Sequence, residues 1–186
     1  MSDTETRRQL EDQIRECFGR VVYSHKTHEK MADRCASNLS RYKLAQIVVT
    51  ALTSSGALGI VVFDEFWLKL ATAGLSFVTL FASAYMKNFD PGGTAQKHRD
   101  TASKLWSIRE NYLSLLTDMN GMPVDAVRAR RDELQGMLGR IYVSAPQTDG
   151  KAYSSAQAAL KYNEELTFDP REIDCFLPTH LRRASK

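Results

Sequence analysis

Two long apolar stretches dominate the pattern of hydrophobic and polar positions along the chain. The first, Leu44 to Phe63, has twenty residues without a charge, and Phe66 to Tyr85 has the same length with Lys69 as its one charge. At about 1.5 Å per helical residue, each stretch spans about 30 Å, the thickness of the hydrocarbon core of a bilayer. The pattern therefore predicts a two-span transmembrane helical hairpin that turns at Asp64 and Glu65.

The segment before the first span has the pattern of an amphipathic helix. Between Arg7 and Tyr42 the apolar positions recur at helical spacing while charged residues occupy the other positions. These apolar positions are Leu10, Ile14, Cys17, Phe18, Val21, Val22 and Met31. Since the first proline is Pro91, nothing except the turn interrupts helix from about Thr4 to Lys87.

The polar region after the second span also has helical patterns. "KNFDPGG" is interpreted as a linker, and helices are predicted at 94–119, from Pro123 onward and at 152–166, with a further helix start at "DPRE", 169–172. No segment alternates with the period of a strand. The predicted fold class is all-α: a transmembrane hairpin (44–86, spans 44–63 and 66–85) with a cytosolic bundle formed by residues 1–43 and 87–186.

A soluble bundle with two core helices is the alternative to a membrane hairpin. Against it, a soluble hairpin would keep a charged stripe toward water, and these spans have none. Lysine and arginine gather before the first span and after the second, and the turn has neither, so the positive-inside rule places both termini in the cytoplasm. Aromatic residues also flank both ends of the hairpin, as at lipid headgroups: Phe63, Phe66 and Trp67 at the turn, and Tyr42, Tyr85 and Phe89 at the other end.

Polar side chains inside the spans suggest a pore. The candidates for lining it are Gln46, Thr50 and Thr53 in the first span and Lys69, Thr72, Ser76, Thr79 and Ser83 in the second. At 100° per residue, the second set falls within about 80° of arc, as one continuous stripe. One hairpin cannot enclose a pore, so this interpretation requires a homo-oligomer. Helix packing alone is the alternative, with Ala51, Ser55 and Gly59 as small residues that admit a close neighbour.

The third set of candidate residues belongs to the cytosolic bundle. The apolar stripe expected to pack against the N-terminal helix consists of Leu105, Trp106, Ile108, Tyr112, Leu113 and Leu116. Leu134, Met137, Leu138 and Ile141 are expected to complete this bundle. A trigger that acts on the bundle could then turn the spans toward a water-filled axis.

Composition and motifs limit the classes of function that the chain could have. A net charge of only +3, with basic and acidic residues interleaved, argues against direct binding of nucleic acid. Three widely spaced cysteines fit a reducing compartment, and the polar residues at the start of the sequence do not predict a signal sequence. His25 and His28 have a spacing that permits metal ligation, but nothing nearby completes four ligands. No phosphate-binding loop or catalytic motif is present, so we expect neither an enzyme nor a cofactor.

Several motifs together resemble a known family. They are "ALTSSG" in the first span, "AQKHRDTASKLWSIRENYLSLLTD", "RRDELQGMLGRIYVSAPQTDGKAY" and "NEELTFDPREIDCFLPTHLR". This order is similar to the SLATT family of two-transmembrane effector domains. The resemblance implies a bacterial antiphage effector that causes abortive infection by opening a pore in the inner membrane. It also implies a partner nucleotidyltransferase or reverse transcriptase, or a nucleotide second messenger; a membrane-anchored helical scaffold without a pore remains the alternative.

Overall fold

The computed structural model of the chain describes residues 3–63 and 65–183. Its elements, in order, are α1 (Asp3–Val62), α2 (Phe66–Phe89), α3 (Pro91–Asp118), η1 (Met119–Gly121), α4 (Val124–Ser144), α5 (Gly150–Lys161), α6 (Pro170–Phe176) and η2 (Thr179–Leu181). No strand occurs among the described residues. The all-α prediction is therefore confirmed, and Asp64, which we placed in the turn, lies outside the described residues.

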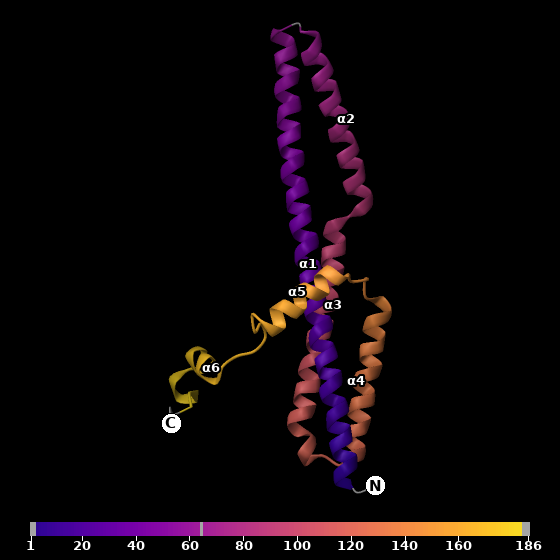
Figure 1. Cartoon of the computed structure of the whole chain (residues 1–186), viewed down its shortest axis with the longest axis vertical. Coiled ribbons are helices and arrows are strands. Elements are labelled where there is room, and N and C mark those ends of the chain that lie inside the picture. The colour runs from indigo at the N-terminus through magenta and orange to yellow at the C-terminus, as the bar shows by residue number, and fades with distance from the viewer. Residues whose placement is uncertain (1–2, 64, 184–186) are drawn as a thin grey trace.

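Helix α1 runs the whole length of the molecule. Its 60 residues correspond to about 90 Å of helix, and its two ends pack against different partners. Figure 1 shows α2 beside its C-terminal half, and α3 and α4 beside its N-terminal half. The predicted boundary between residues 43 and 44 thus falls inside one continuous helix, because no proline or glycine pair interrupts it.

The connection between the hairpin and the bundle is a single residue, where a linker was predicted. Helix α2 ends at Phe89 and α3 begins at Pro91, with Asp90 between them in the left-handed conformation at φ 31°. The backbone N–H of Asp90 donates to Met86 O at 3.2 Å, and its Oδ1 accepts from Gly93 N at 2.9 Å. One aspartate therefore ends α2 and caps α3, and the glycines that suggested a loop lie in the first turn of α3.

The bundle is built around α1, α3 and α4. Its core consists of Leu10, Ile14, Cys17 and Val21 from α1, Leu105, Ile108, Tyr112 and Leu115 from α3, Met119 from η1, and Val127 and Leu134 from α4. Helix α5 crosses α1 and buries three alanines, whose small side chains let two helices approach closely: Ala152, Ala156 and Ala159. This crossing lies next to the start of the hairpin (Figure 1).

The remaining helices differ from their predicted bounds by a few residues. Pro123 is the residue before α4, whereas we expected it to be the first helical residue. Helix α5 starts two residues earlier and ends five residues earlier than predicted. The predicted helix start at "DPRE" is confirmed, since Asp169 Oδ1 accepts from Arg171 N at 2.8 Å and α6 begins at Pro170.

Candidate functional site

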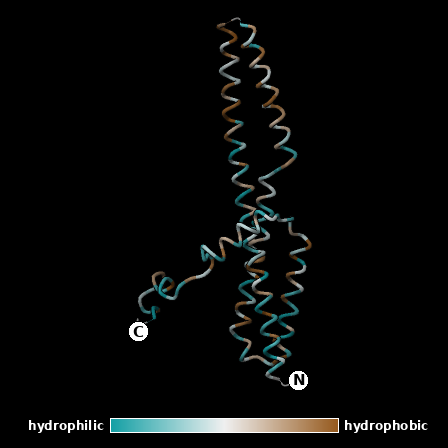
Figure 2. The backbone as a smooth tube through the Cα atoms, in the orientation of Figure 1, coloured by the Kyte–Doolittle hydropathy of each residue, from teal (hydrophilic) through white to brown (hydrophobic). Residues whose placement is uncertain are grey.

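The hairpin has no buried core of its own. Neither α2 nor residues 43–62 of α1 contain a buried residue, and large apolar side chains such as Leu58 and Phe81 are more than 70% exposed. Figure 2 shows that apolar residues predominate along both helices of the hairpin. Both helices are long and apolar enough to cross a membrane, and no residue of the most apolar stretch of either one is buried among the described residues. Such uncovered helices do not fit the core of a soluble bundle, whose helices would be covered, and they favour the membrane hairpin.

The two spans meet along a narrow polar and small-residue interface. Gln46 Nε2 donates to Ser83 Oγ at 3.0 Å near one end of the hairpin. Nearer the turn, a Cβ added to Gly56 would lie 2.5 Å from Thr72 Oγ1, so only glycine allows this approach. These contacts set the register of the hairpin.

The predicted pore-lining residues separate into two groups. Half-buried positions face the other span: Gln46, Thr53, Thr72, Thr79 and Ser83. Thr50, Lys69 and Ser76 are exposed. The hydroxyls of Thr53, Thr72, Ser76, Thr79 and Ser83 each donate to the carbonyl four residues earlier, at 2.8–2.9 Å. Packing within one hairpin therefore explains the first group.

The exposed group shares one edge of the hairpin. Measured from Thr53, Thr50 lies about 60° round α1. Measured from Thr72, Ser76 and Lys69 lie about 40° and 60° round α2. Because the two helices are antiparallel, rotations of the same sign place these residues on the same side. Ser54, which is also exposed, lies on this side about 100° round α1. We call Thr50, Ser54, Lys69 and Ser76 the polar edge.

The predicted small-residue series does not pack as a unit in one chain. Ala51 and Ser55 are exposed on the face of α1 that points away from α2. Gly59 is half-buried, with a position for Cβ 3.2 Å from Leu68 Cδ2. Gly56 and Gly59 therefore serve the hairpin, and Ala51 and Ser55 face the surroundings.

The spans diverge toward the bundle. They leave an apolar groove of about 610 Å³ whose lining includes Tyr42, Val49, Phe77, Phe81 and Tyr85. Figure 1 shows this widening between α1 and α2. An acyl chain or an apolar side chain from a neighbouring helix would fit its lining.

Some residues of the predicted bundle stripe are buried and others are exposed. Leu105, Ile108 and Tyr112 are buried and Leu116 is half-buried, whereas Trp106 is 51% and Leu113 is 44% exposed. Of the α4 residues, Leu134 is buried, Leu138 and Ile141 pack against the core and Met137 is exposed. Leu115 occupies the core position that the prediction missed, and the spacing 105, 108, 112, 115 would have found it.

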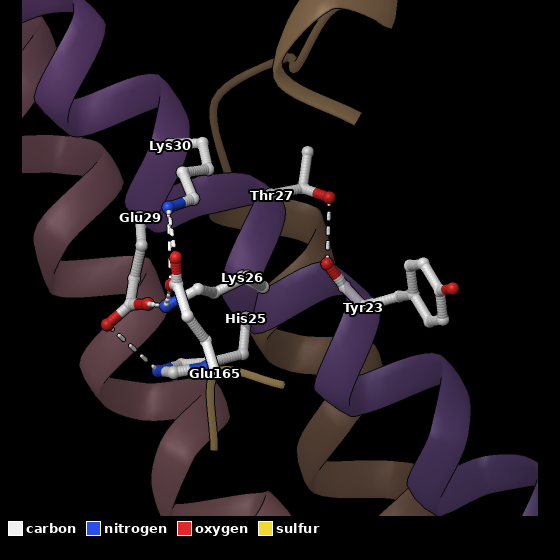
Figure 3. Close-up of polar contacts among 7 residues, drawn as sticks. All are labelled: Tyr23, His25, Lys26, Thr27, Glu29, Lys30 and Glu165. Carbon is white, nitrogen blue, oxygen red and sulfur yellow. Dashed lines mark hydrogen bonds and ion pairs between the residues drawn. The ribbon is translucent and has the colours of Figure 1, made fainter. Parts of the chain in front are cut away.

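A cluster of ion pairs attaches the chain after α5 to α1 (Figure 3). Lys26 Nζ lies 2.8 Å from Glu29 Oε2 and 2.6 Å from Glu165 Oε2, and Lys30 Nζ is 3.1 Å from Glu165 Oε1. Burial opposes the charged amine, yet hydrogen bonds to Glu165 and Glu29 raise the pKa of Lys26. Hydrogen bonds from Lys26 and Lys30 lower the pKa of Glu165. This cluster fixes the position at which the C-terminal segment leaves the bundle.

The histidines that prompted the metal question lie inside the bundle. His28 Nδ1 is 2.9 Å from His98 Nδ1, and both rings are buried between α1 and α3. His25 is buried as well, with Nε2 3.6 Å from Glu29 Oε1. Within the described residues there is no group of three or more His, Cys, Asp or Glu side chains that could hold a metal ion. The pair joins α1 to α3 by one N–H···N hydrogen bond, which requires at least one neutral ring.

The His28–His98 pair predicts an acid-labile bundle. Burial, with smaller effects from His98 and His25, lowers the pKa of His28 from 6.5 to about 4. Below pH 6.5 the unfolded chain therefore binds a proton that the folded chain does not, so stability falls as the pH drops toward 4. We expect a loss of roughly 3 kcal/mol over this range. Denaturant melts of the full chain in detergent should show it, and His28→Gln should flatten the pH dependence; equal slopes in both proteins would contradict it.

Comparison with known proteins agrees with the two-span architecture. Residues 10–172 match the SMODS and SLOG-associating 2TM effector domain family 4, which covers both spans and the bundle. No curated protein and no solved structure matches the chain. SLATT domains are effector domains of antiphage systems, associate with SMODS and SLOG partner domains, and are not a known enzyme family. With its exposed apolar hairpin and this match over most of its length, the chain belongs to the SLATT family of membrane effector domains, as a member of family 4.

Proposed function

We propose that this protein is the membrane effector of a bacterial abortive-infection system, and that it oligomerises into a pore in the inner membrane when triggered. The polar edge carries the proposal. Thr50, Ser54, Lys69 and Ser76 are exposed together on one side of a hairpin whose outer surface is mostly apolar. Polar side chains that gather on one side of a hairpin are typical of a surface that faces water or the polar surface of a neighbouring helix.

An assembly of hairpins would give this edge a favourable environment. If copies surround one axis with their polar edges inward, the hydroxyls and Lys69 line water while the apolar faces meet lipid. Ala51 and Ser55 would then be free to admit a neighbouring helix. The half-buried set needs no rotation in this arrangement, so Thr72 and Thr79 stay inside the hairpin. This replaces our expectation that a trigger turns them toward the axis.

The orientation is part of the proposal. Basic residues near the bundle and their rarity near the turn support cytoplasmic termini with Glu65 outside. A cysteine at Glu65, in a chain without exposed native cysteines, should react with a membrane-impermeant maleimide in intact cells. A cysteine at Glu164, which is exposed on the bundle side, should react only after lysis. The reverse labelling would contradict the orientation.

The bundle is the element on which a trigger would act. Helix α1 is common to the bundle and the hairpin, and α3 follows α2 after one residue, so a change in bundle packing has a direct path to both spans. A partner nucleotidyltransferase or reverse transcriptase, or a nucleotide second messenger, would supply the signal. A membrane-anchored scaffold without pore activity is the competing function.

Dye release from liposomes tests the pore. Ser76→Leu should remove a polar group from the lining and suppress release, while Ser76→Thr keeps the hydroxyl and should retain it. The control is Gly74→Leu, because Gly74 is also exposed on α2 but lies on the opposite side of that helix from Ser76, with nothing within 4 Å of its Cβ position. Release by Ser76→Leu equal to wild type would refute this lining, and a bilayer that stays sealed although the inserted wild-type protein has oligomerised would favour the scaffold.

A further inference from the structure

The chain after α5 forms an arm with an uncovered apolar surface. We define the C-terminal arm as residues 167–183, which contain α6 and η2. Phe168, Ile173, Phe176 and Leu181 are between 44% and 75% exposed, and no residue of α6 is buried. Figure 1 shows the arm extending away from the bundle. Large apolar side chains gathered on a short segment are typical of a surface that binds another protein.

The arm is nevertheless a folded unit. Asp169 caps α6, Asp174 Oδ1 accepts from Arg183 N at 3.3 Å, and Arg182 Nε donates to Leu177 O at 2.9 Å. Its base is held to α1 by the ion pairs of Glu165 with Lys26 and Lys30. A preformed arm with a fixed base loses little conformational entropy when it binds.

A groove of complementary character lies between α3 and α4. Its volume is about 350 Å³, and Ile108, Met137 and Ile141 form the apolar part of its lining. Lys104 and Arg140 flank them, and no carboxylate lines the groove in the described part of the chain. The groove is thus apolar at its centre and positively charged at its rim.

The charges of helix α6 and its cap oppose those of the groove. Helix α6 and its cap, residues 169–176, contain three carboxylates and one arginine, namely Asp169, Glu172 and Asp174 against Arg171, whereas Arg182 and Arg183 lie at the end of the arm. Opposite potentials across a contact favour the correct partner and register. Helix α6, with exposed Ile173 and Phe176 and an excess of carboxylates, therefore matches the groove in both apolar content and charge.

The direction of the arm decides whose groove it meets. Glu165 holds its base on α1, and the arm extends away from α4 (Figure 1). We propose that the C-terminal arm of one copy docks into the α3–α4 groove of a second copy. Because the two surfaces differ, the contact is heterologous and repeats from copy to copy, so it closes into a ring when the rotation permits. The inference rests on the proposed assembly and specifies its cytosolic contact.

Disulfide trapping between two distinguishable copies tests the contact. Cys175 of the arm is exposed and Cys17 is buried, so a Cys35→Ser background leaves one reactive thiol. The second copy carries Cys35→Ser, Cys175→Ser and Met137→Cys in the groove, with a different tag. Mixed full-length proteins in detergent should form a mixed disulfide on oxidation. Gly139→Cys is the matched control, since Gly139 is exposed two residues further along α4, on another side of the helix, and should not crosslink.

Charge exchange provides the second readout. Arg140→Glu in the groove and Glu172→Arg on the arm should each reduce crosslinking severalfold, and mixing the two variants should restore it. The absence of a mixed disulfide between the two copies, or equal crosslinking at Gly139→Cys, overturns the inference. If the protein is oligomeric but Met137→Cys forms no crosslink with Cys175, the docking contact is overturned while the proposed pore stands. If the chain stays monomeric at all concentrations, both the docking contact and the proposed pore are overturned.

Discussion

Replacing Gly56 with leucine will separate the two spans, while the same replacement at Gly74 will leave them together. Any side chain at Gly56 meets Thr72, with Oγ1 at 2.5 Å from the Cβ position and both Cβ and Cγ2 at 3.5 Å. Overpacking of this kind costs about 1–3 kcal/mol and is relieved here by moving one helix away from the other. Around Gly74 nothing lies within 4 Å of the Cβ position, so leucine there only adds apolar surface.

Crosslinking across the hairpin measures this separation. Gln46 and Ser83 are hydrogen-bonded at 3.0 Å, so cysteines at these two positions should be joined by a short bismaleimide in a chain without exposed native cysteines. Gly56→Leu should abolish the crosslink and dye release together, and Gly74→Leu should preserve both. A crosslink that survives Gly56→Leu would show that the register is set elsewhere, and a loss in both variants would indicate a general effect of bulk.

The result matters because the polar edge exists only in this register. Thr50 and Ser54 come from α1, whereas Lys69 and Ser76 come from α2. They fall on one side because the Gly56–Thr72 contact and the Gln46–Ser83 hydrogen bond fix how each helix is rotated. Separating the spans would scatter these four residues even if both spans stayed inserted.

The sequence was sufficient to predict the helices and their division into a membrane hairpin and a bundle. Uncharged stretches of bilayer length and the absence of proline before Pro91 predict both spans and the long helix before the turn. The junction at Asp90 was missed because proline and two glycines usually indicate a loop. A carboxylate that caps α3 and a left-handed backbone that ends α2 remove the need for a linker, and this local geometry is not visible from composition.

The rotation of the helices could be predicted only in part. Period alone puts Thr72, Ser76 and Thr79 on one stripe, but it does not say which of them meets the other span. Contact with Gly56 takes Thr72 into the interface and leaves Ser76 outside. Ser54 was not selected for the lining because it joins the polar edge only when two antiparallel helices are placed side by side.

The second large effect is expected on the stability of the bundle, and two adjacent residues of the predicted stripe test it. Leu105→Ala should destabilise the bundle by about 2–5 kcal/mol, because the side chain is 0% exposed and its loss leaves a cavity among Ile14, Val21 and their neighbours. Trp106→Ala removes a larger side chain that is 51% exposed, and it should cost much less, since little of that surface is withdrawn from water.

Denaturant melts of the full chain in detergent, monitored by the loss of helical signal from the bundle, compare the stabilities of the two variants. Helix α1 leaves the core of the bundle and enters the span as one continuous helix. If it transmits the state of the bundle to the hairpin, Leu105→Ala should also change dye release at the temperature where the bundle begins to open. Trp106→Ala should follow the wild-type release curve. A larger loss of stability in Trp106→Ala would mean that the exposed face of α3 is covered in the assembled protein, and unchanged release after Leu105→Ala unfolds the bundle would show that the hairpin acts without it.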